Sequence, residues 1–133
     1  MFLLDTNVIS EIRKPRPHGA LLHWIRPIPV AYLAISAMTI GEIQSGIERV
    51  RCNDPAKAVE LEAWVAGILG NHAILPIDGP VAQEWARLIH GKSRALMEDA
   101  FIAATARVHG LVVATRNVSD FALFDVPTMN PFE

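Results

Sequence analysis

The sequence contains very little cysteine: Cys52 is the only one among its 133 residues. A single cysteine cannot form an intrachain disulfide, and it cannot form a Cys-x-x-Cys zinc or redox pair. The five histidines show no metal-type spacing, so we assign them no chemistry. These absences predict a protein of the reducing cytoplasm.

An excess of positive charge is also missing. The chain has 12 Lys and Arg residues against 14 Asp and Glu residues, which gives a formal net charge of −2 and an isoelectric point near 6.2. Many nucleic-acid-binding proteins are strongly basic overall, and this one is not. A polyanionic partner must therefore meet a local basic patch or a bridging metal ion.

Long hydrophobic runs are absent as well. The uncharged stretch from Pro27 to Gly41 contains two prolines and is shorter than the roughly 20 apolar residues of a membrane helix. The first apolar run ends at Asp5 after four residues, which is too short for a signal peptide. Yet 51% of the residues are hydrophobic, which is too many for a disordered chain. We expect one domain, without a membrane segment, folded around its own core.

Short apolar runs alternate with amphipathic segments along the chain. The runs predict four buried strands, at residues 2–4, 32–35, 73–75 and 111–114. Apolar spacing, capping residues and breakers predict a brief helix after residues 5–7 and further helices at 20–25, from 40 onward, 54–70, 78–91 and 97–109. This alternation is typical of an α/β fold with a parallel sheet, in which functional sites lie at the carboxyl edge of the strands.

Four acidic residues fall at that predicted edge. Asp5 ends the first strand, Glu42 lies in the first turn of the helix after the second strand, Asp99 opens the alanine-rich helix and Asp120 follows the last strand. Four carboxylates in one pocket would repel one another unless protons or a cation intervened. Mg²⁺ or Mn²⁺, which prefers oxygen ligands, would suit them and could activate water against a phosphodiester.

Each acid also has a purely structural interpretation. Thr39 and Glu42 match a capping box, Asp99 could complement a helix dipole, and Asp120 could be an ordinary N-cap. Asp5 is harder to explain in this way. A charge directly after a buried strand costs several kcal/mol of desolvation unless it is paired or bound to metal, so Asp5 carries most weight.

Four segments together resemble a known family. They are residues 4–10, 36–43, 98–106 and 115–121, and the closing residues 130–133 agree with them. The chain resembles PIN-domain ribonucleases and, more narrowly, VapC-type toxins of bacterial toxin–antitoxin pairs in the FitB-like branch. The resemblance spans the chain and implies a single PIN domain over residues 1–133, with a parallel sheet of about four to five strands and helices on both faces.

This resemblance implies a cytoplasmic Mg²⁺- or Mn²⁺-dependent endoribonuclease. Such proteins are usually dimeric and are inhibited by an antitoxin that inserts a segment into the active-site groove. The first three family acids fall on Asp5, Glu42 and Asp99, and the fourth position is filled by either Asp120 or Asn117. Small polar groups that orient ligands or waters fall on Thr6, Asn7, Ser36, Thr39 and Thr115.

Two questions stay open at the level of sequence. The basic residues Arg13, Lys14, Arg16 and Arg116 are candidates for binding RNA phosphates; for the first three we prefer this interpretation to that of a solvated proline-rich loop. The function itself has an alternative. The chain could be a non-catalytic partner in a toxin–antitoxin complex that binds DNA only through the antitoxin and represses its own operon.

Overall fold

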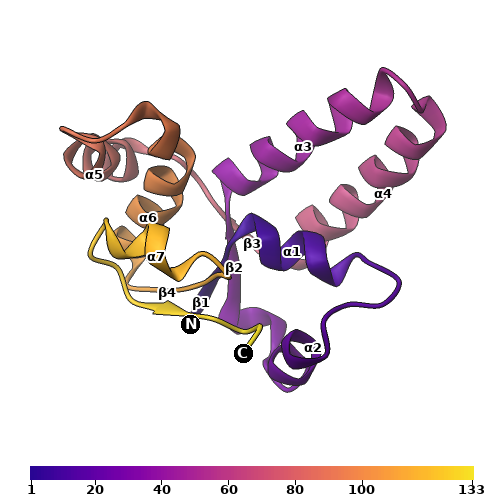
Figure 1. Cartoon of the computed structure of the whole chain (residues 1–133), viewed down its shortest axis with the longest axis horizontal. Helices are drawn as coiled ribbons and strands as arrows, with labels where there is room; N and C mark the ends of the chain where they lie inside the picture. Colours follow the sequence, from indigo (N-terminus) through magenta and orange to yellow (C-terminus); the bar gives the residue numbers. More distant parts are fainter.

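Five short parallel strands form the centre of the computed structural model, which describes residues 1–133. They lie in the order β3-β2-β1-β4-β5, and every neighbouring pair is parallel. Their bounds are β1 Phe2–Leu4, β2 Leu33–Ser36, β3 Ala73–Leu75, β4 Val112–Ala114 and β5 Thr128–Met129. The predicted parallel α/β fold is confirmed (Figure 1).

Seven α-helices surround this sheet. They are α1 Thr6–Ile12, α2 Gly19–Ile25, α3 Ala37–Arg51, α4 Pro55–Asn71, α5 Gly79–Ile89, α6 Met97–His109 and α7 Val118–Ala122, with short 3₁₀ turns at Val30–Tyr32 and Arg94–Leu96. In Figure 1, α3 and α4 form a long hairpin on one side of the sheet, and α5, α6 and α7 lie on the other. No helix is both long enough and apolar enough to cross a membrane.

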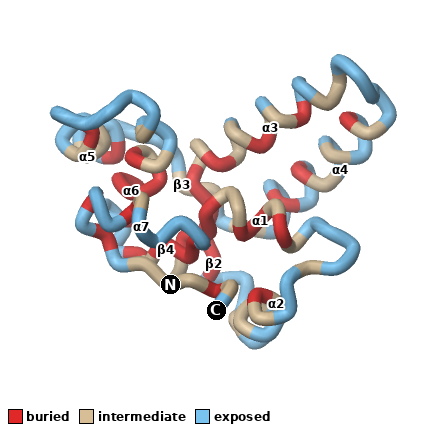
Figure 2. The backbone as a smooth tube through the Cα atoms, viewed as in Figure 1, coloured by how far each residue is buried: buried red, intermediate tan, exposed pale blue.

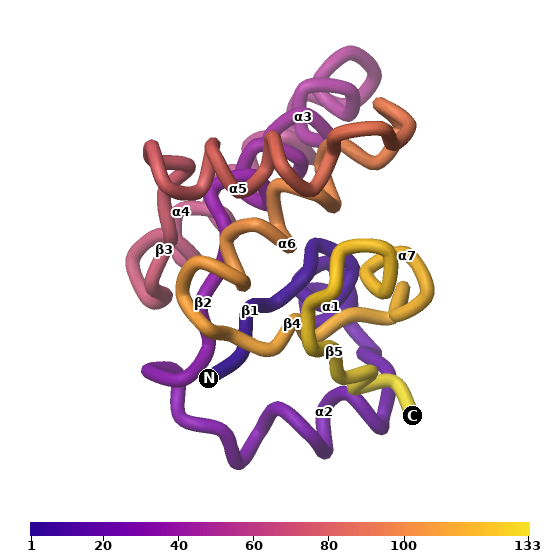
Figure 3. The backbone as a smooth tube through the Cα atoms, turned by 90° about the vertical axis from the view of Figure 1, so that its left-hand side faces the viewer, coloured from indigo at the N-terminus to yellow at the C-terminus, as the bar shows by residue number.

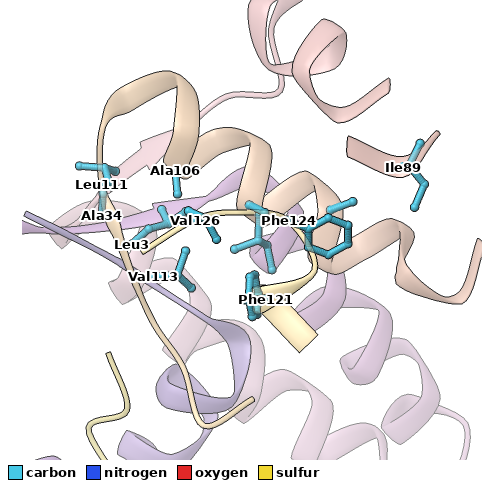
Figure 4. Packing of buried hydrophobic residues seen from close by; sticks show 12 residues of the cluster. Leu3, Ala34, Ile89, Ala106, Leu111, Val113, Phe121, Phe124 and Val126 are labelled. Atoms are coloured by element: carbon cyan, nitrogen blue, oxygen red, sulfur yellow. The ribbon is translucent and has the colours of Figure 1, made fainter. Parts of the chain in front are cut away.

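The sheet is covered on both faces because neighbouring strand residues point to opposite sides. Leu3 and Val113 belong to a core with α5, α6 and α7 (Figure 4). Leu4 and Ile35 belong to a second core with the first four helices. Figure 2 shows burial along β2 and most of β1 and β4, whereas the edge strands β3 and β5 contain no buried residue. This two-sided burial explains why the strands appear in the sequence as unbroken apolar runs.

Several predicted helix ends are confirmed by their capping groups. The Asp54 and Asp78 carboxylates accept hydrogen bonds of 3.1 Å from the backbone amides of Lys57 and Val81. Gly110 ends α6 with a φ of 66°, a left-handed conformation that glycine adopts without strain.

The segment around the second strand differs from the prediction. Tyr32 is exposed in a 3₁₀ turn, so β2 begins one residue later. Helix α3 begins at Ala37 because Ser36 caps it, its hydroxyl accepting a 3.1 Å hydrogen bond from the Met38 amide. The interpretation of Thr39 and Glu42 as a capping box is therefore wrong. Glu42 lies in the second turn of α3, whereas the sequence placed it in the first.

The end of the chain corrects a second structural interpretation. Asn117 is the N-cap residue of α7, so Asp120 lies inside this helix and is not an N-cap. The fourth strand begins at Val112, while α4 extends to Asn71 and α5 ends at Ile89. These shifts of one or two residues leave the order of elements as predicted.

Candidate active site

Asp5 lies where β1 passes directly into α1 at the carboxyl edge of the sheet. Only 4% of the residue is exposed. Its carboxylate accepts hydrogen bonds from the Thr6 amide at 2.8 Å, the Asn7 side chain at 3.1 Å and the Thr115 hydroxyl at 2.8 Å. Burial nevertheless outweighs these donors and raises the pKa of Asp5. The protein holds this carboxylate firmly but does not neutralise it.

Glu42 reaches the same region from α3. The Thr6 hydroxyl donates a 2.9 Å hydrogen bond to its carboxylate and so ties α1 to α3. Burial, followed by the neighbouring carboxyl of Glu98, raises the pKa of Glu42 to about 7. Glu98 is a site residue that we did not predict. The only signal for it was its position beside Asp99, and this is weak because α6 could have turned its side chain away.

Asp99 and Asp120 complete the acidic cluster, defined as Asp5, Glu42, Glu98, Asp99 and Asp120. Asp99 lies in the first turn of α6. Burial, followed by the charges of Asp5 and Asp120, raises its pKa to about 6. Asp120 also raises the pKa of Asp5. The structure therefore brings together all four acids that the sequence placed at the strand edge.

The smaller polar residues have different surroundings. Thr115 is fully buried, and its hydroxyl joins Asp5 to the backbone amide of Asn117, which donates to it at 2.9 Å. The Asn117 side chain makes no capping hydrogen bond. Thr39 is buried with its hydroxyl oxygen 3.3 Å from that of Thr6. Ser36, described above, is occupied in capping α3.

The basic residues separate into two pairs. The Lys14 ammonium lies 2.9 Å from the Glu11 carboxylate, and Arg16 is exposed. The Arg13 guanidinium lies 5.7 Å from the centre of the Trp64 ring. That of Arg116 lies 3.8 Å from the Phe132 ring centre. Arg13 and Arg116 therefore lie against aromatic side chains and form no ion pair.

Arg13 also lines a groove that includes part of the acidic cluster. This groove, which we call the α3 groove, has a volume of about 490 Å³, and its lining includes Glu42, Glu98, Arg13, Arg49 and Trp64. It joins acidic and basic side chains in one continuous surface. Its position beside Glu42 makes it a candidate substrate channel.

The acidic cluster differs from the other acids of the chain. Outside it, nearly every carboxylate is already engaged within the fold. Asp54 and Asp78 cap helices, and the acids that lie in ion pairs are Glu11, Glu48, Glu60, Glu62, Glu84 and Asp125. No lysine, arginine or histidine forms an ion pair with any member of the cluster. Five neighbouring acids without a counter-charge would be strongly stabilised by a bound cation.

A divalent cation fits this chemistry. No three acidic side chains, as they stand, converge closely enough to hold one ion as a closed cage. Mg²⁺ does not need such a cage, because it keeps several waters and usually takes only one or two carboxylates together with substrate phosphates. The strongest candidate ligands are the carboxylates of Asp5, which is buried, and of Asp99, which is half-buried; neither forms an ion pair.

A comparison with protein families agrees with this geometry. The model described as the PIN domain matches residues 2–125. This chain belongs to the PIN-domain family. The match includes β1, with Asp5 at its end, and the segments that carry the other acids of the cluster. The resemblance found in the sequence is confirmed.

Individual relatives show which branch of the PIN-domain family this chain resembles. This PIN domain is 39% identical over 139 residues to Toxin FitB of Neisseria gonorrhoeae, with 99% of each chain covered. It is 34% identical over 139 residues to VapC ribonuclease Y4jK of Sinorhizobium fredii, with 100% of this chain and 99% of the relative covered. It is thus similar to VapC-type toxins, and the FitB-like branch is confirmed.

Solved structures show the same relationship. The crystal structure of FitAcB from Neisseria gonorrhoeae superimposes with a TM-score of 0.85 at 38% identity, covering 100% of this chain and 99% of that one. The structure of FitAB bound to a DNA fragment gives a TM-score of 0.73 at 34% identity, covering 100% and 96%. The fold predicted from sequence therefore matches that of the relatives.

Proposed function

We propose that this chain is a Mg²⁺- or Mn²⁺-dependent endoribonuclease that acts as the toxin of a toxin–antitoxin pair. The observation that carries the proposal is the acidic cluster: five acids without a counter-charge at the carboxyl edge of a parallel sheet, in a PIN-domain chain. The relative named VapC ribonuclease supports RNA as the substrate class. Residues 1–133 would then act as one catalytic PIN domain in the cytoplasm.

Within this proposal Asp5, Asp99 and Asp120 are metal ligands, and Glu42 is a ligand or a proton carrier. A bound ion would polarise the scissile phosphodiester and lower the pKa of an attacking water. The protein itself positions the ligands. Asp5 is fixed by three hydrogen bonds, and the Thr6 hydroxyl orients Glu42. Because the pKa of Glu42 is about 7, this carboxyl can hold or release a proton near neutral pH.

The supporting polar residues and the basic residues have defined parts in the same proposal. Asn7 and Thr115 keep Asp5 in place through the contacts described above. Arg13 and Arg116 would contact RNA phosphates, and the absence of an ion pair at either residue supports this role. Lys14 is a weaker candidate for phosphate binding, because it already forms an ion pair with Glu11. The proposed set of supporting polar and RNA-binding residues also includes Arg16, Ser36, Thr39 and Asn117.

The partners follow from the family. We propose a cognate antitoxin that blocks the groove, a homodimer, and contact with DNA only through the antitoxin. The FitB relative occurs in the FitAB complex with a DNA fragment, which supports the last point. The non-catalytic alternative is not favoured, because a protein that only bound its partner would have no need for five unneutralised acids, two of them with pKa values raised to about 6 and about 7.

The test is RNA cleavage during titration with Mg²⁺ or Mn²⁺, with EDTA as the metal-free control. Asp99→Asn is the sharpest variant, because the Asp99 carboxylate accepts no hydrogen bond from the protein and the substitution removes only charge. Asp5→Asn should also abolish cleavage. It is less clean, because its new amide group would face the donors of Asn7 and Thr115.

A matched control is Glu60→Gln, an exposed acid outside the cluster. We expect cleavage by the wild type and by Glu60→Gln, and loss of cleavage with Asp99→Asn or EDTA. Cleavage that persists in Asp99→Asn would refute the metal-site assignment. Absence of cleavage by the wild type across varied RNAs, with metal bound, would favour the non-catalytic alternative.

A further inference from the structure

The α3 groove combines three features that the acidic cluster does not explain. Trp64 forms part of its lining from α4, while Arg13 and Arg49 contribute cationic groups from the end of α1 and from α3. Neither arginine forms an ion pair with an acid. The Arg49 guanidinium makes only a 3.2 Å hydrogen bond to the Ser45 hydroxyl. Two exposed cations without ion pairs, beside an aromatic ring, are groups that an anionic, planar ligand could use.

We propose that the α3 groove is a nucleotide subsite for single-stranded RNA, in which an unpaired base stacks on Trp64 and a neighbouring phosphate contacts Arg13 and Arg49. This inference rests on the proposed ribonuclease function and extends it to how the substrate is bound. Proteins that bind unpaired RNA combine aromatic stacking platforms with positively charged grooves. Both elements occur here in one cavity with Glu42.

The geometry of α3 connects this subsite to the acidic cluster. Glu42 and Arg49 are seven residues apart, which places them on one helix face about 10 Å apart along the axis. Gly46 lies between them and also lines the groove. The missing side chain at Gly46 keeps the path between the acid and the arginine open. A strand of RNA that has its phosphate at the cluster can therefore continue along α3 toward Arg49.

Trp64 is also available for stacking. Arg13 lies 5.7 Å from the ring centre, close to the roughly 6 Å limit of a cation–π contact. Arg116, by comparison, lies 3.8 Å from the Phe132 ring. The guanidinium of Arg13 thus approaches the Trp64 ring without stacking closely on it, and a base that stacked on this face would move the exposed Arg13 side chain aside, toward the neighbouring phosphate. The groove volume of about 490 Å³ falls in the range of small-ligand pockets.

The experiment measures affinity for RNA directly, without metal and without cleavage. Asp99→Asn protein is titrated in EDTA against a short fluorescein-labelled single-stranded RNA, and anisotropy reports binding. Trp64→Leu removes the aromatic face, and we expect affinity to fall by roughly 5- to 160-fold, the range for losing one base–aromatic stack. Trp64→Phe keeps an aromatic ring and should retain most of the affinity.

Trp64 also packs against the core, so a second variant leaves it in place. Gly46→Leu fills the groove, and the only atom within 4 Å of the added Cβ is the Arg49 guanidinium nitrogen at 3.7 Å. Gly67→Leu is the matched control, because Gly67 is exposed in α4 with nothing within 4 Å. Both substitutions favour the helix, but only Gly46→Leu should weaken RNA binding.

A third measurement changes the RNA and leaves the protein unaltered. Removing one base at a time from the same RNA should lower affinity strongly at one position, and Trp64→Leu should abolish that position's effect. A flat profile, or wild-type affinity in both Trp64→Leu and Gly46→Leu, would overturn the proposal. Loss of antitoxin binding with unchanged RNA affinity would overturn it too and would make the groove a protein-docking site.

These outcomes are distinguishable from failure of the ribonuclease proposal. If the catalytic assignment is wrong, Asp99→Asn leaves cleavage unchanged, whatever Trp64 does. If only the subsite is wrong, metal-dependent cleavage still requires Asp99, while KM for the RNA is the same in Trp64→Leu and the wild type. Support for both requires that Trp64→Leu raise KM with kcat little changed, because Trp64 does not touch the reacting phosphate.

Discussion

Replacing Glu42 by glutamine should stabilise the metal-free protein at alkaline pH. Folding raises the pKa of this carboxyl from 4.5 to about 7. Between these values the folded protein keeps a proton that the unfolded chain has released, so the free energy of unfolding falls as pH rises. The contribution of Glu42 is therefore fully favourable below about pH 4.5 and is lost by about pH 7. Glutamine never ionises and avoids this loss.

The magnitude follows from the same two values. A rise from 4.5 to about 7 corresponds to about 3 kcal/mol at 1.36 kcal/mol per pH unit. Because the carboxyl is only half-buried, screening by solvent reduces this to roughly 1–2 kcal/mol. The amide oxygen of glutamine can still accept the hydrogen bond from the Thr6 hydroxyl, so little favourable contact is lost.

Urea denaturation in EDTA at about pH 5 and about pH 8 tests this reasoning. Wild type and Glu42→Gln should differ little at the lower pH, and the variant should be more stable by ~1–2 kcal/mol at the higher pH. Glu60→Gln, at an exposed ion pair, should behave as the wild type does. Two results would contradict this reasoning: a Glu42→Gln protein less stable than the wild type at about pH 8, or one that loses stability with rising pH as steeply as the wild type. Either would show that folding does not disfavour the ionised carboxylate of Glu42.

Three further predictions concern the surroundings of the cluster. Saturating Mg²⁺ or Mn²⁺ should raise Tm, by an amount equivalent to about 2.7 kcal/mol at a hundredfold excess over Kd, and Asp99→Asn should lose this shift in a thermal melt. Asp120→Ala should reduce RNA cleavage more than Asn117→Ala; equal activity in Asp120→Ala and wild type would place the fourth ligand elsewhere. A double-mutant cycle of Arg116→Ala and Phe132→Ala in urea should give a coupling of about 0.5–1 kcal/mol, whereas additive losses would mean that their stacking contributes nothing.

Local rules predicted the start of the site well. Asp5 follows three apolar residues and precedes two residues that favour turns and helix caps. This one short segment therefore predicts the strand, the turn that follows it and the carboxylate between them. The same was true of the two-sided sheet, because unbroken apolar strands are typical of parallel sheets. In these places the local preference and the tertiary structure agree.

The position of Glu42 shows where such rules fail. Two residues were able to cap α3, and the sequence does not say which one does so. Ser36 is the cap because β2 runs directly into the helix without a connecting loop. This moves Glu42 by a turn, yet it still faces Thr6, because the two residues meet through packing of α1 against α3. Long-range contacts of this kind fix the site although a helix boundary was misplaced.

The C-terminal residues are a further contact that the sequence does not reveal. From the sequence, Arg116 was a candidate contact for an RNA phosphate just after the fourth strand. In the structure it stacks on Phe132, whose ring also lies 5.5 Å from that of His18. Figure 3 shows the C-terminal end of the chain beside α2. The last residues of the chain thereby connect the α1–α2 loop to the loop after β4. The sequence named the residues, but it could not show that they touch.

Which acids form the site was the hardest question for the sequence, and it is also where the structure adds most. Fourteen acids look alike in composition. They separate only when their partners are known, because a carboxylate that caps a helix or pairs with arginine is already satisfied, whereas one buried among other acids is not. Glu98 is exposed, and it joined the cluster only because it lies beside Glu42 and has no cation of its own. A missing partner can be seen only in three dimensions, so the cluster that repels itself, and not the number of acids, identifies where a cation should bind.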